Sequence, residues 1–97
     1  MYIIVCCDVK TESAAGRKRL RRVAKACEAC GQRVQNSIFE CQLDSVQKRA
    51  LVGKLLKIID QDEDSLRIYN LGKNYRQKIE HWGTKNVPDL SKDTIIF

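Results

Sequence analysis

The sequence predicts an α+β fold, in which one four-stranded antiparallel sheet carries two helices on one of its faces. Three observations lead to this expectation. The length of 97 residues suits a single domain. Short β-prone apolar runs and two longer patterns with helical spacing follow one another along the chain. Their order is β-α-β-β-α-β, which is that of the ferredoxin-like fold.

The first expected strand is the apolar run at residues 2–7, which leads directly to Asp8. The run is short, partly β-branched and without alternating polar residues, which is typical of a strand covered on both faces. Asp8 would therefore lie where the buried scaffold meets solvent, a good position from which to hold a metal ion. The alternative is that Asp8 caps the turn after the strand.

The first expected helix has its cap at Thr11 or Ser13 and runs to about Cys30. Gly31 is placed to end it. One stripe of this helix is apolar and consists of Leu20, Val23, Ala24, Cys27 and Cys30. The opposite side is almost purely cationic: Lys18, Arg21, Arg22 and Lys25 lie on it, with Arg17 and Arg19 on its flanks. A merely solvated face would fit a mixture of Glu and Lys better, so contact with phosphate is the favoured interpretation.

Two strands, a helix and a last strand complete the pattern. Residues 33–43 are expected to be extended, with a turn or bulge at residues 35–37. A second helix is expected over residues 44–59, with its cap at the first or second of these residues. The last strand is expected over residues 65–71, because apolar and polar residues alternate there.

The strand pattern also predicts a homodimer. Two helices can cover one face of the sheet, yet the first strand is apolar throughout. Tyr69 and Leu71 would lie on the uncovered side as well. For so small a chain, a second copy is the simplest cover for this face.

The chain is expected to divide into a ferredoxin-like domain at residues 1–72 and a C-terminal tail at residues 73–97. The tail is polar until residues 94–97, which are apolar and β-prone. Such a terminus would dock as an extra strand on a sheet edge of the partner subunit or of another protein. A frayed end is the alternative.

Composition excludes several classes of protein. With 43% hydrophobic and 31% charged residues, the chain is globular rather than disordered. It has no apolar run long enough to span a membrane and no secretory signal pattern, so a cytoplasmic location with reduced cysteines is expected. The net charge is +6, of which +4 lies in residues 1–43. This excess favours nucleic acid weakly by itself, and its concentration on one helix strengthens that preference.

Four stretches together resemble one family, the CRISPR-associated protein 2 family. YIIVCCDV resembles its aromatic-apolar-DV opening, and GRKRLRRVAKACEACG is similar to its first helix. GQRVQNSIFEC matches the stretch G-x-R-V-Q-x-S-[VI]-F-E, and DSLRIYNLG resembles its fourth strand. The resemblance covers residues 1 to about 72 in the right order. The helix with Cys27 and Cys30, and the tail segment YRQKIEHWG, look most like the short subtype I-C members.

The resemblance implies a function that composition does not show. Members are prokaryotic ferredoxin-like homodimers that bridge two dimers of CRISPR-associated protein 1, the integrase. Together the two proteins capture foreign DNA and insert it into the CRISPR array as new spacers. The family's strand-one aspartate matches Asp8, which in some members binds a divalent metal shared between subunits. Some members are described as metal-dependent nucleases on RNA or DNA, and others act only structurally.

A magnesium site at Asp8 would need help from a second chain. Mg²⁺ prefers octahedral oxygen ligands and usually keeps several waters beside one or two carboxylates. Asp8 of a partner subunit would supply the second carboxylate, and the metal would activate water or neutralise a phosphodiester. Arg33 and Ser37 lie in the matching motif and would orient the phosphate.

Other candidate sites carry less weight. His81 lacks a surrounding motif, so a surface or packing role is favoured over catalysis. Cys27 and Cys30 have the spacing of half a zinc or redox site, but both lie on the apolar stripe, which favours packing.

Two functions remain. The leading hypothesis is a scaffold that binds double-stranded DNA, or single-stranded RNA as the alternative, through its first helix and engages the integrase through its tail. The other is a metal-dependent endonuclease that uses paired Asp8 carboxylates. A third candidate, the RNA-recognition motif, shares the order of elements but lacks its aromatic block here.

Overall fold

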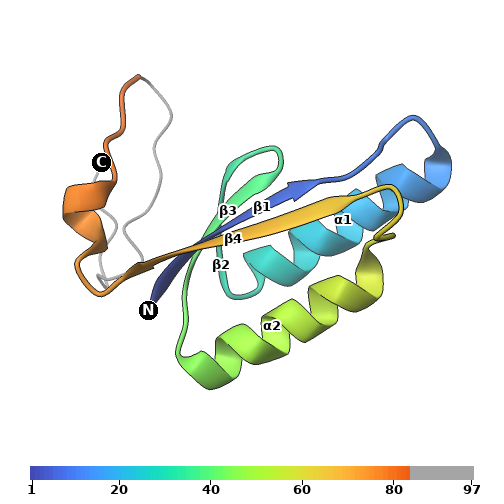
Figure 1. Cartoon of the computed structure of the whole chain (residues 1–97). Helices are drawn as coiled ribbons and strands as arrows, with labels where there is room; N and C mark the ends of the chain where they lie inside the picture. The colour runs from blue at the N-terminus through green and yellow to red at the C-terminus, as the bar shows by residue number, and fades with distance from the viewer. Residues whose placement is uncertain (84–97) are drawn as a thin grey trace.

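The computed structural model describes residues 1–83 of the chain. The strand predicted at residues 94–97 lies outside the described residues. In chain order the elements are β1 (Tyr2–Asp8), α1 (Ala14–Glu28), β2 (Gly31–Gln35), β3 (Ile38–Gln42), α2 (Ser45–Ile58), β4 (Ser65–Gly72) and the 3-10 helix η1 (Tyr75–Lys78). This order confirms the predicted β-α-β-β-α-β pattern (Figure 1).

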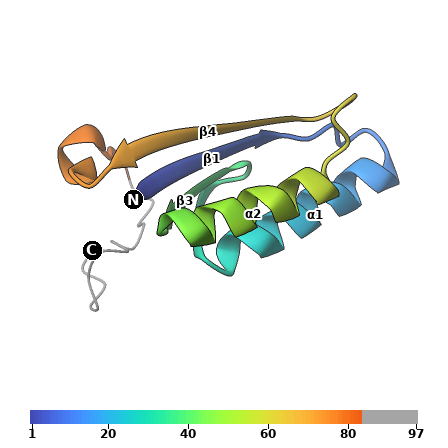
Figure 2. The ribbon, with the colours of Figure 1, turned by 60° about the horizontal axis from the view of Figure 1, so that its bottom comes forward.

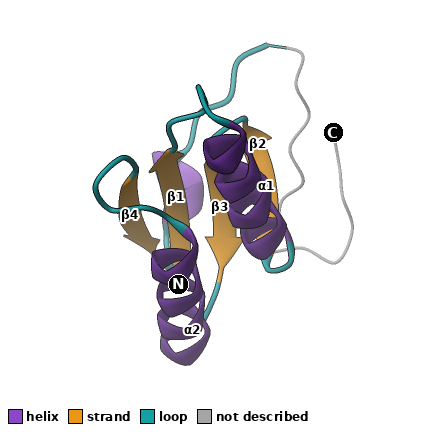
Figure 3. Cartoon of the chain, turned by 90° about the vertical axis from the view of Figure 1, so that its right-hand side faces the viewer, coloured by secondary structure: helices purple, strands orange, loops and turns teal. Residues whose placement is uncertain are grey.

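The four strands form one antiparallel sheet in the order β2-β3-β1-β4. Both helices lie on the same face of this sheet, side by side, so the molecule has two layers (Figures 2 and 3). This is the ferredoxin-like α+β fold that the sequence predicts. No helix within residues 1–83 is long and apolar enough to cross a membrane.

The core lies between the sheet and the two helices. Along β1, Ile3, Val5 and Cys7 point into this core and are buried. Phe39 of β3 and Leu55 of α2 are fully buried beside them. Because strand residues alternate between faces, the remaining residues of β1 face the side that the helices leave open.

Both helices begin at a residue that caps the first turn with its side chain. The Ser13 hydroxyl accepts a hydrogen bond from the Gly16 N–H at 3.0 Å, which decides between the two predicted caps of α1. At α2, the Asp44 carboxylate accepts from the Gln47 N–H, and the Gln47 side chain accepts from the Asp44 N–H in return.

The first helix ends earlier than predicted, and Gly31 has a different role from the predicted one. Glu28 is the last residue of α1, and Gly31 already belongs to β2. A Cβ atom at Gly31 would come within 2.4 Å of the Glu40 carbonyl oxygen on β3. Glycine is therefore needed for the close approach of two strands rather than for a helix stop.

The open face of the sheet is partly apolar in a single chain. On β1 it carries Ile4 and Cys6, which are half-buried. Opposite Ile4, Tyr69 of β4 keeps 46% of its surface exposed. Leu66 and Ile68 lie on the core side of the same strand and pack against the core. The pattern on which the predicted dimer rests is thus present in the fold.

One end of the open face is covered by the segment after β4. Tyr75, the first residue of η1, stacks on the Tyr2 ring with the ring centroids 3.9 Å apart. The Tyr2 hydroxyl donates to the Glu40 carboxylate at 2.7 Å. Asp8 lies at the other end of β1 from Tyr2, so this cover does not reach it.

Candidate metal and nucleic-acid sites

Asp8 is the last residue of β1, and its side chain is exposed. Its backbone pairs with Ser65 of β4, and the neighbouring Cys7 N–H donates to the Ser37 carbonyl at 3.0 Å. Within residues 1–83, no hydrogen bond or ion pair from the Asp8 carboxylate is found. The strand end is held on both sides while its carboxylate stays open to solvent.

The donor chemistry at Asp8 suits a hard divalent cation, but one chain supplies too few ligands. A carboxylate oxygen is the kind of ligand that Mg²⁺ takes. In the described part of the chain, no three His, Cys, Asp or Glu side chains gather in a way that could hold a metal ion. A metal site at Asp8 would therefore need oxygen ligands from outside this chain.

The cationic side of α1 is exposed as the sequence predicts. The exposed residues of this side are Arg17, Lys18, Arg21, Arg22 and Lys25. Two of them, Arg21 and Lys25, line a hollow of about 540 Å³ together with Arg33 of β2. The hollow brings three of the predicted phosphate-binding cations to one place, between the last turns of α1 and the start of β2.

Arg33 is held rather than free. Its guanidinium donates two hydrogen bonds to the Asn36 carbonyl and lies 5.6 Å from the centre of the Phe39 ring. Its Nη1 atom is 3.9 Å from the Glu28 carboxylate, which offsets part of its charge. Arg33 therefore fixes the β2–β3 turn, and its position at the hollow is set by these contacts.

Ser37 lies apart from that hollow, in the β2–β3 turn next to the end of β1. Its carbonyl accepts from the Cys7 N–H, and the Cys7 thiol lies 3.7 Å from the same oxygen. The structure thus brings Ser37 to the Asp8 strand end. It does not bring Ser37 together with Arg21 and Lys25 of the cationic helix.

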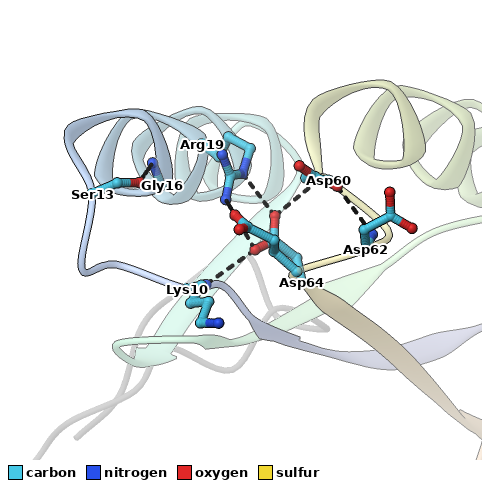
Figure 4. Close-up of polar contacts among 8 residues, drawn as sticks. Lys10, Ser13, Gly16, Arg19, Asp60, Asp62 and Asp64 are labelled. Carbon is cyan, nitrogen blue, oxygen red and sulfur yellow. Dashed lines mark hydrogen bonds and ion pairs between the residues drawn. The ribbon is translucent and has the colours of Figure 1, made fainter.

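Arg19 has a role that sequence reasoning missed. It is one of the cationic residues of α1, but its side chain turns away from the exposed cationic side of the helix. It forms an ion pair with Asp64 at 2.8 Å (Figure 4). Glu63 adds a second contact at 3.3 Å. The sequence does signal a cation partner here, because four of the five residues at 60–64 are acidic, but it does not show which cation pairs with them.

The Asp64 carboxylate is completely buried, with 0% of its side chain exposed. Burial raises the pKa of a carboxyl group, but the Arg19 guanidinium and the N–H groups of Asp60 and Lys10 outweigh burial and lower the pKa of Asp64 to about 2. Asp64 is therefore charged at neutral pH and fully hydrogen-bonded.

The cysteines are free thiols in the described structure and three of them are buried. Burial raises the pKa of Cys7 to about 11 and that of Cys41 to about 12, and it also raises the pKa of Cys27. Such thiols stay protonated at neutral pH and behave as small apolar groups. Cys30 is half-buried at the end of the same stripe.

The fold and the sites define a small ferredoxin-like α+β protein with a cationic first helix and an exposed carboxylate at the end of β1. The family model described as CRISPR associated protein Cas2 matches residues 1–79. The chain belongs to the Cas2 family.

Individual relatives agree with this assignment. The chain is 54% identical to the CRISPR-associated endonuclease Cas2 of Halalkalibacterium halodurans over 97 residues, which is 100% of both chains. It is 49% identical to the CRISPR-associated endoribonuclease Cas2 of Chlorobaculum tepidum over 99% of this chain and 100% of that protein. The crystal structure of Streptococcus pyogenes Cas2 at pH 6.5 superposes with a TM-score of 0.79 and 49% identity, covering 86% of this chain and 100% of that one.

Proposed function

We propose that this protein is a nucleic-acid-binding subunit of CRISPR adaptation, which holds DNA and scaffolds the integrase while new spacers are acquired. The observation that carries this proposal is the exposed cationic side of α1, whose Arg21 and Lys25 meet Arg33 at one hollow. Exposed cations in a row bind a phosphate backbone without reading its sequence. A subunit that accepts many different spacers needs this kind of contact.

The proposed working unit is a homodimer. In the described part of each chain, α1 and α2 leave one face of the sheet open, and that face carries the half-buried Ile4 and Cys6 and the exposed Tyr69. Pairing two such faces would bury this apolar surface, and it would give the dimer two cationic helices instead of one. We also propose that residues 73–97 act as a tail for contact with the partner subunit or the integrase.

The binding proposal is tested with duplex DNA over a range of salt concentrations. The slope of log K against log salt should be steep, because each neutralised phosphate contributes about 0.9 to it. Arg21→Ala and Lys25→Ala should each reduce the slope by about one such contribution. Lys54→Ala is the matched control, because Lys54 is an exposed cation on α2 outside the proposed surface. Equal effects of all three variants would argue against a defined surface on α1.

A second candidate function is favoured by the names of the relatives. The proteins from H. halodurans and C. tepidum are called endonuclease and endoribonuclease. By likeness to them, we propose as the alternative that this chain cleaves RNA or double-stranded DNA through Asp8. A divalent ion such as Mg²⁺, when bound there, would lower the pKa of a water and offset charge on the phosphodiester.

In that alternative the residues of this chain have simple tasks. Asp8 would provide one carboxylate of the metal site, and Asp8 of the second subunit would provide the other. Two carboxylates at close range repel each other, so they would bind a cation more tightly than either alone. The cationic residues of α1 would hold the nucleic acid, and Ser37, beside the end of β1, would contact a phosphate there.

One pair of assays separates the two functions. Asp8→Ala should abolish Mg²⁺-dependent cleavage if the chain is an enzyme. Spacer acquisition with the integrase should survive the same change if the chain acts as a scaffold. Loss of acquisition together with cleavage would favour the enzyme. A monomer at micromolar concentration would contradict the shared Asp8 site and the dimer alike.

A further inference from the structure

We infer that Arg19 and Asp64 are a positioning pair that fixes Asp8 at the end of β1. This inference rests on the proposed role of Asp8 as a metal ligand, and it adds the means by which the chain holds that ligand in place. Figure 4 shows the pair with the backbone groups that it ties together. Neither residue belongs to the cationic surface proposed for nucleic acid.

The first tie runs along the chain. The Lys10 N–H, two residues after Asp8, donates to the Asp64 carboxylate at 3.0 Å. On the other side Gly16 lies close against the Lys10 carbonyl, since a Cβ atom at Gly16 would come within 1.7 Å of the carbonyl oxygen. Since the first turn of α1 packs directly on this carbonyl, the segment that leaves β1 has little room to move.

The second tie runs across the sheet. Asp8 pairs with Ser65, the first residue of β4, and Asp64 is the residue immediately before it. The Asp64 carboxylate also accepts from the Asp60 N–H at 2.9 Å, and the Asp64 N–H donates to the Asp60 carbonyl at 2.6 Å. Ser65, the β4 residue that pairs with Asp8, is therefore held in place through the Asp64 carboxylate.

Arg19 closes this arrangement from the helix. Its Nε and Nη2 atoms both reach the Asp64 carboxylate, at 2.8 and 3.3 Å, so the contact is bidentate. Only 16% of the Arg19 side chain is exposed, against 0% for Asp64. A cation in this position is satisfied within the chain and is poorly placed for an external phosphate.

The proposed metal site explains why Asp8 would need such support. Its own carboxylate has no hydrogen-bond or ion-pair partner among the described residues, so the backbone alone sets its direction. Two Asp8 carboxylates brought together would repel before a metal binds. A strand end that gave way would let them separate, and metal affinity would fall. The Arg19–Asp64 pair resists that movement.

The experiment compares the full-length dimer with a set of variants. Arg19→Gln removes the ion pair, Arg19→Lys keeps its charge, and Leu51→Val loosens the core in α2 without touching the pair. Backbone order at Asp8 is measured by ¹⁵N relaxation, with the core strand residue Val5 as an internal reference. Binding of Mn²⁺, a paramagnetic probe for the divalent site, is measured by titration, with Asp8→Ala defining the binding that depends on Asp8.

In Arg19→Gln, the order parameter at Asp8 should fall from about 0.85 toward 0.6, while that of Val5 stays unchanged. Asp8-dependent Mn²⁺ affinity should fall about 10-fold, as is usual when support for a metal ligand is lost. Arg19→Lys keeps the charge but cannot form the bidentate contact, so both values should lie between those of Arg19→Gln and the wild type. Leu51→Val should change neither, which separates positioning from a general loss of stability.

The outcomes distinguish failure of this inference from failure of the metal proposal. If the folded Arg19→Gln variant keeps its order at Asp8, or loses order but keeps full Mn²⁺ affinity, the positioning role is wrong. If the wild-type dimer shows no Asp8-dependent Mn²⁺ binding, the metal role of Asp8 is wrong. Since Asp64→Asn removes charge from the other member of the pair, it should reproduce the Arg19→Gln result. Failure to do so also contradicts the inference.

Discussion

Two carboxylates at one end of the sheet, Asp8 and Asp64, differ in almost every respect. Asp64 is buried and accepts hydrogen bonds from Arg19 and from two backbone N–H groups. Asp8 pairs across the sheet with Ser65, the residue after Asp64, yet it is exposed. Its carboxylate has no such partner among the described residues. A carboxylate whose bonds are all made within the chain stabilises the fold. One without internal partners remains available for a ligand.

The difference has a physical origin in the cost of burying a charge. A buried carboxylate is costly unless charged and hydrogen-bonding partners replace its water. Asp64 has these partners, and its lowered pKa reports that they outweigh burial. Asp8 keeps its water and needs no partner, so nothing in residues 1–83 competes with an incoming cation.

The largest expected effect on stability comes from removing the buried carboxylate of Asp64. Asp64→Ala should lower the free energy of unfolding by about 3 kcal/mol, because Arg19 and two N–H groups lose their acceptor at once. Asp62→Ala is the matched control in the same exposed loop and should change it by less than about 0.5 kcal/mol. Urea unfolding measures both. Similar values for the two variants would mean that the buried pair contributes little.

Low pH should weaken the Arg19–Asp64 ion pair over a defined pH range. The pKa of Asp64 is lowered from its ordinary value near 3.8 to about 2 in the folded chain. Its contribution to stability is therefore complete above about pH 4 and is lost as the pH falls toward 2. Unfolding by urea between pH 5 and 2 should show this loss in the wild type and a smaller one in Asp64→Asn. Parallel curves for the two proteins would contradict the lowered pKa.

The elements of this fold could be predicted because each depends on local pattern. Caps at Ser13 and Asp44, the apolar stripe of α1 and the β-prone runs all act within a few residues. The end of α1 was misplaced because Gly31 reads as a helix stop, while its contact with Glu40 on β3 is a tertiary one. No local pattern reveals such a close approach between strands.

The candidate site, like the fold, could be predicted only where it depends on local pattern. The position of Asp8 at a strand end follows from the apolar run before it, and the exposed side of α1 follows from helical spacing. The partner of Arg19 could not be predicted from local pattern, because Asp64 is 45 residues away in the sequence. A helical wheel places Arg19 on a flank, and only the packing of the β1–α1 and α2–β4 connections decides that it turns inward.

The cations of α1 should differ in the same way as the two carboxylates, with a smaller effect. An exposed cation should bind DNA, and one paired within the chain should not. Arg22 is exposed, so Arg22→Ala should lower the salt slope of duplex DNA binding by about 0.9 and weaken binding a few-fold at moderate salt. Arg19→Gln should change the slope much less, because Asp64 already neutralises that charge. The comparison is made by fluorescence titration at several salt concentrations. Equal slopes for the two variants would place Arg19 on the binding surface.

The smallest expected effect has the opposite sign to that of Asp64. Asp8→Asn should raise the stability of the dimer by a few tenths of a kcal/mol at low salt without divalent ions, because it removes repulsion between two Asp8 carboxylates. The gain should vanish at about 1 M salt, where such repulsion is screened, and added Mg²⁺ should stabilise the wild type but not the variant. Thermal unfolding of both proteins under these three conditions measures this. A variant that is less stable than the wild type at low salt would mean that Asp8, like Asp64, serves the fold.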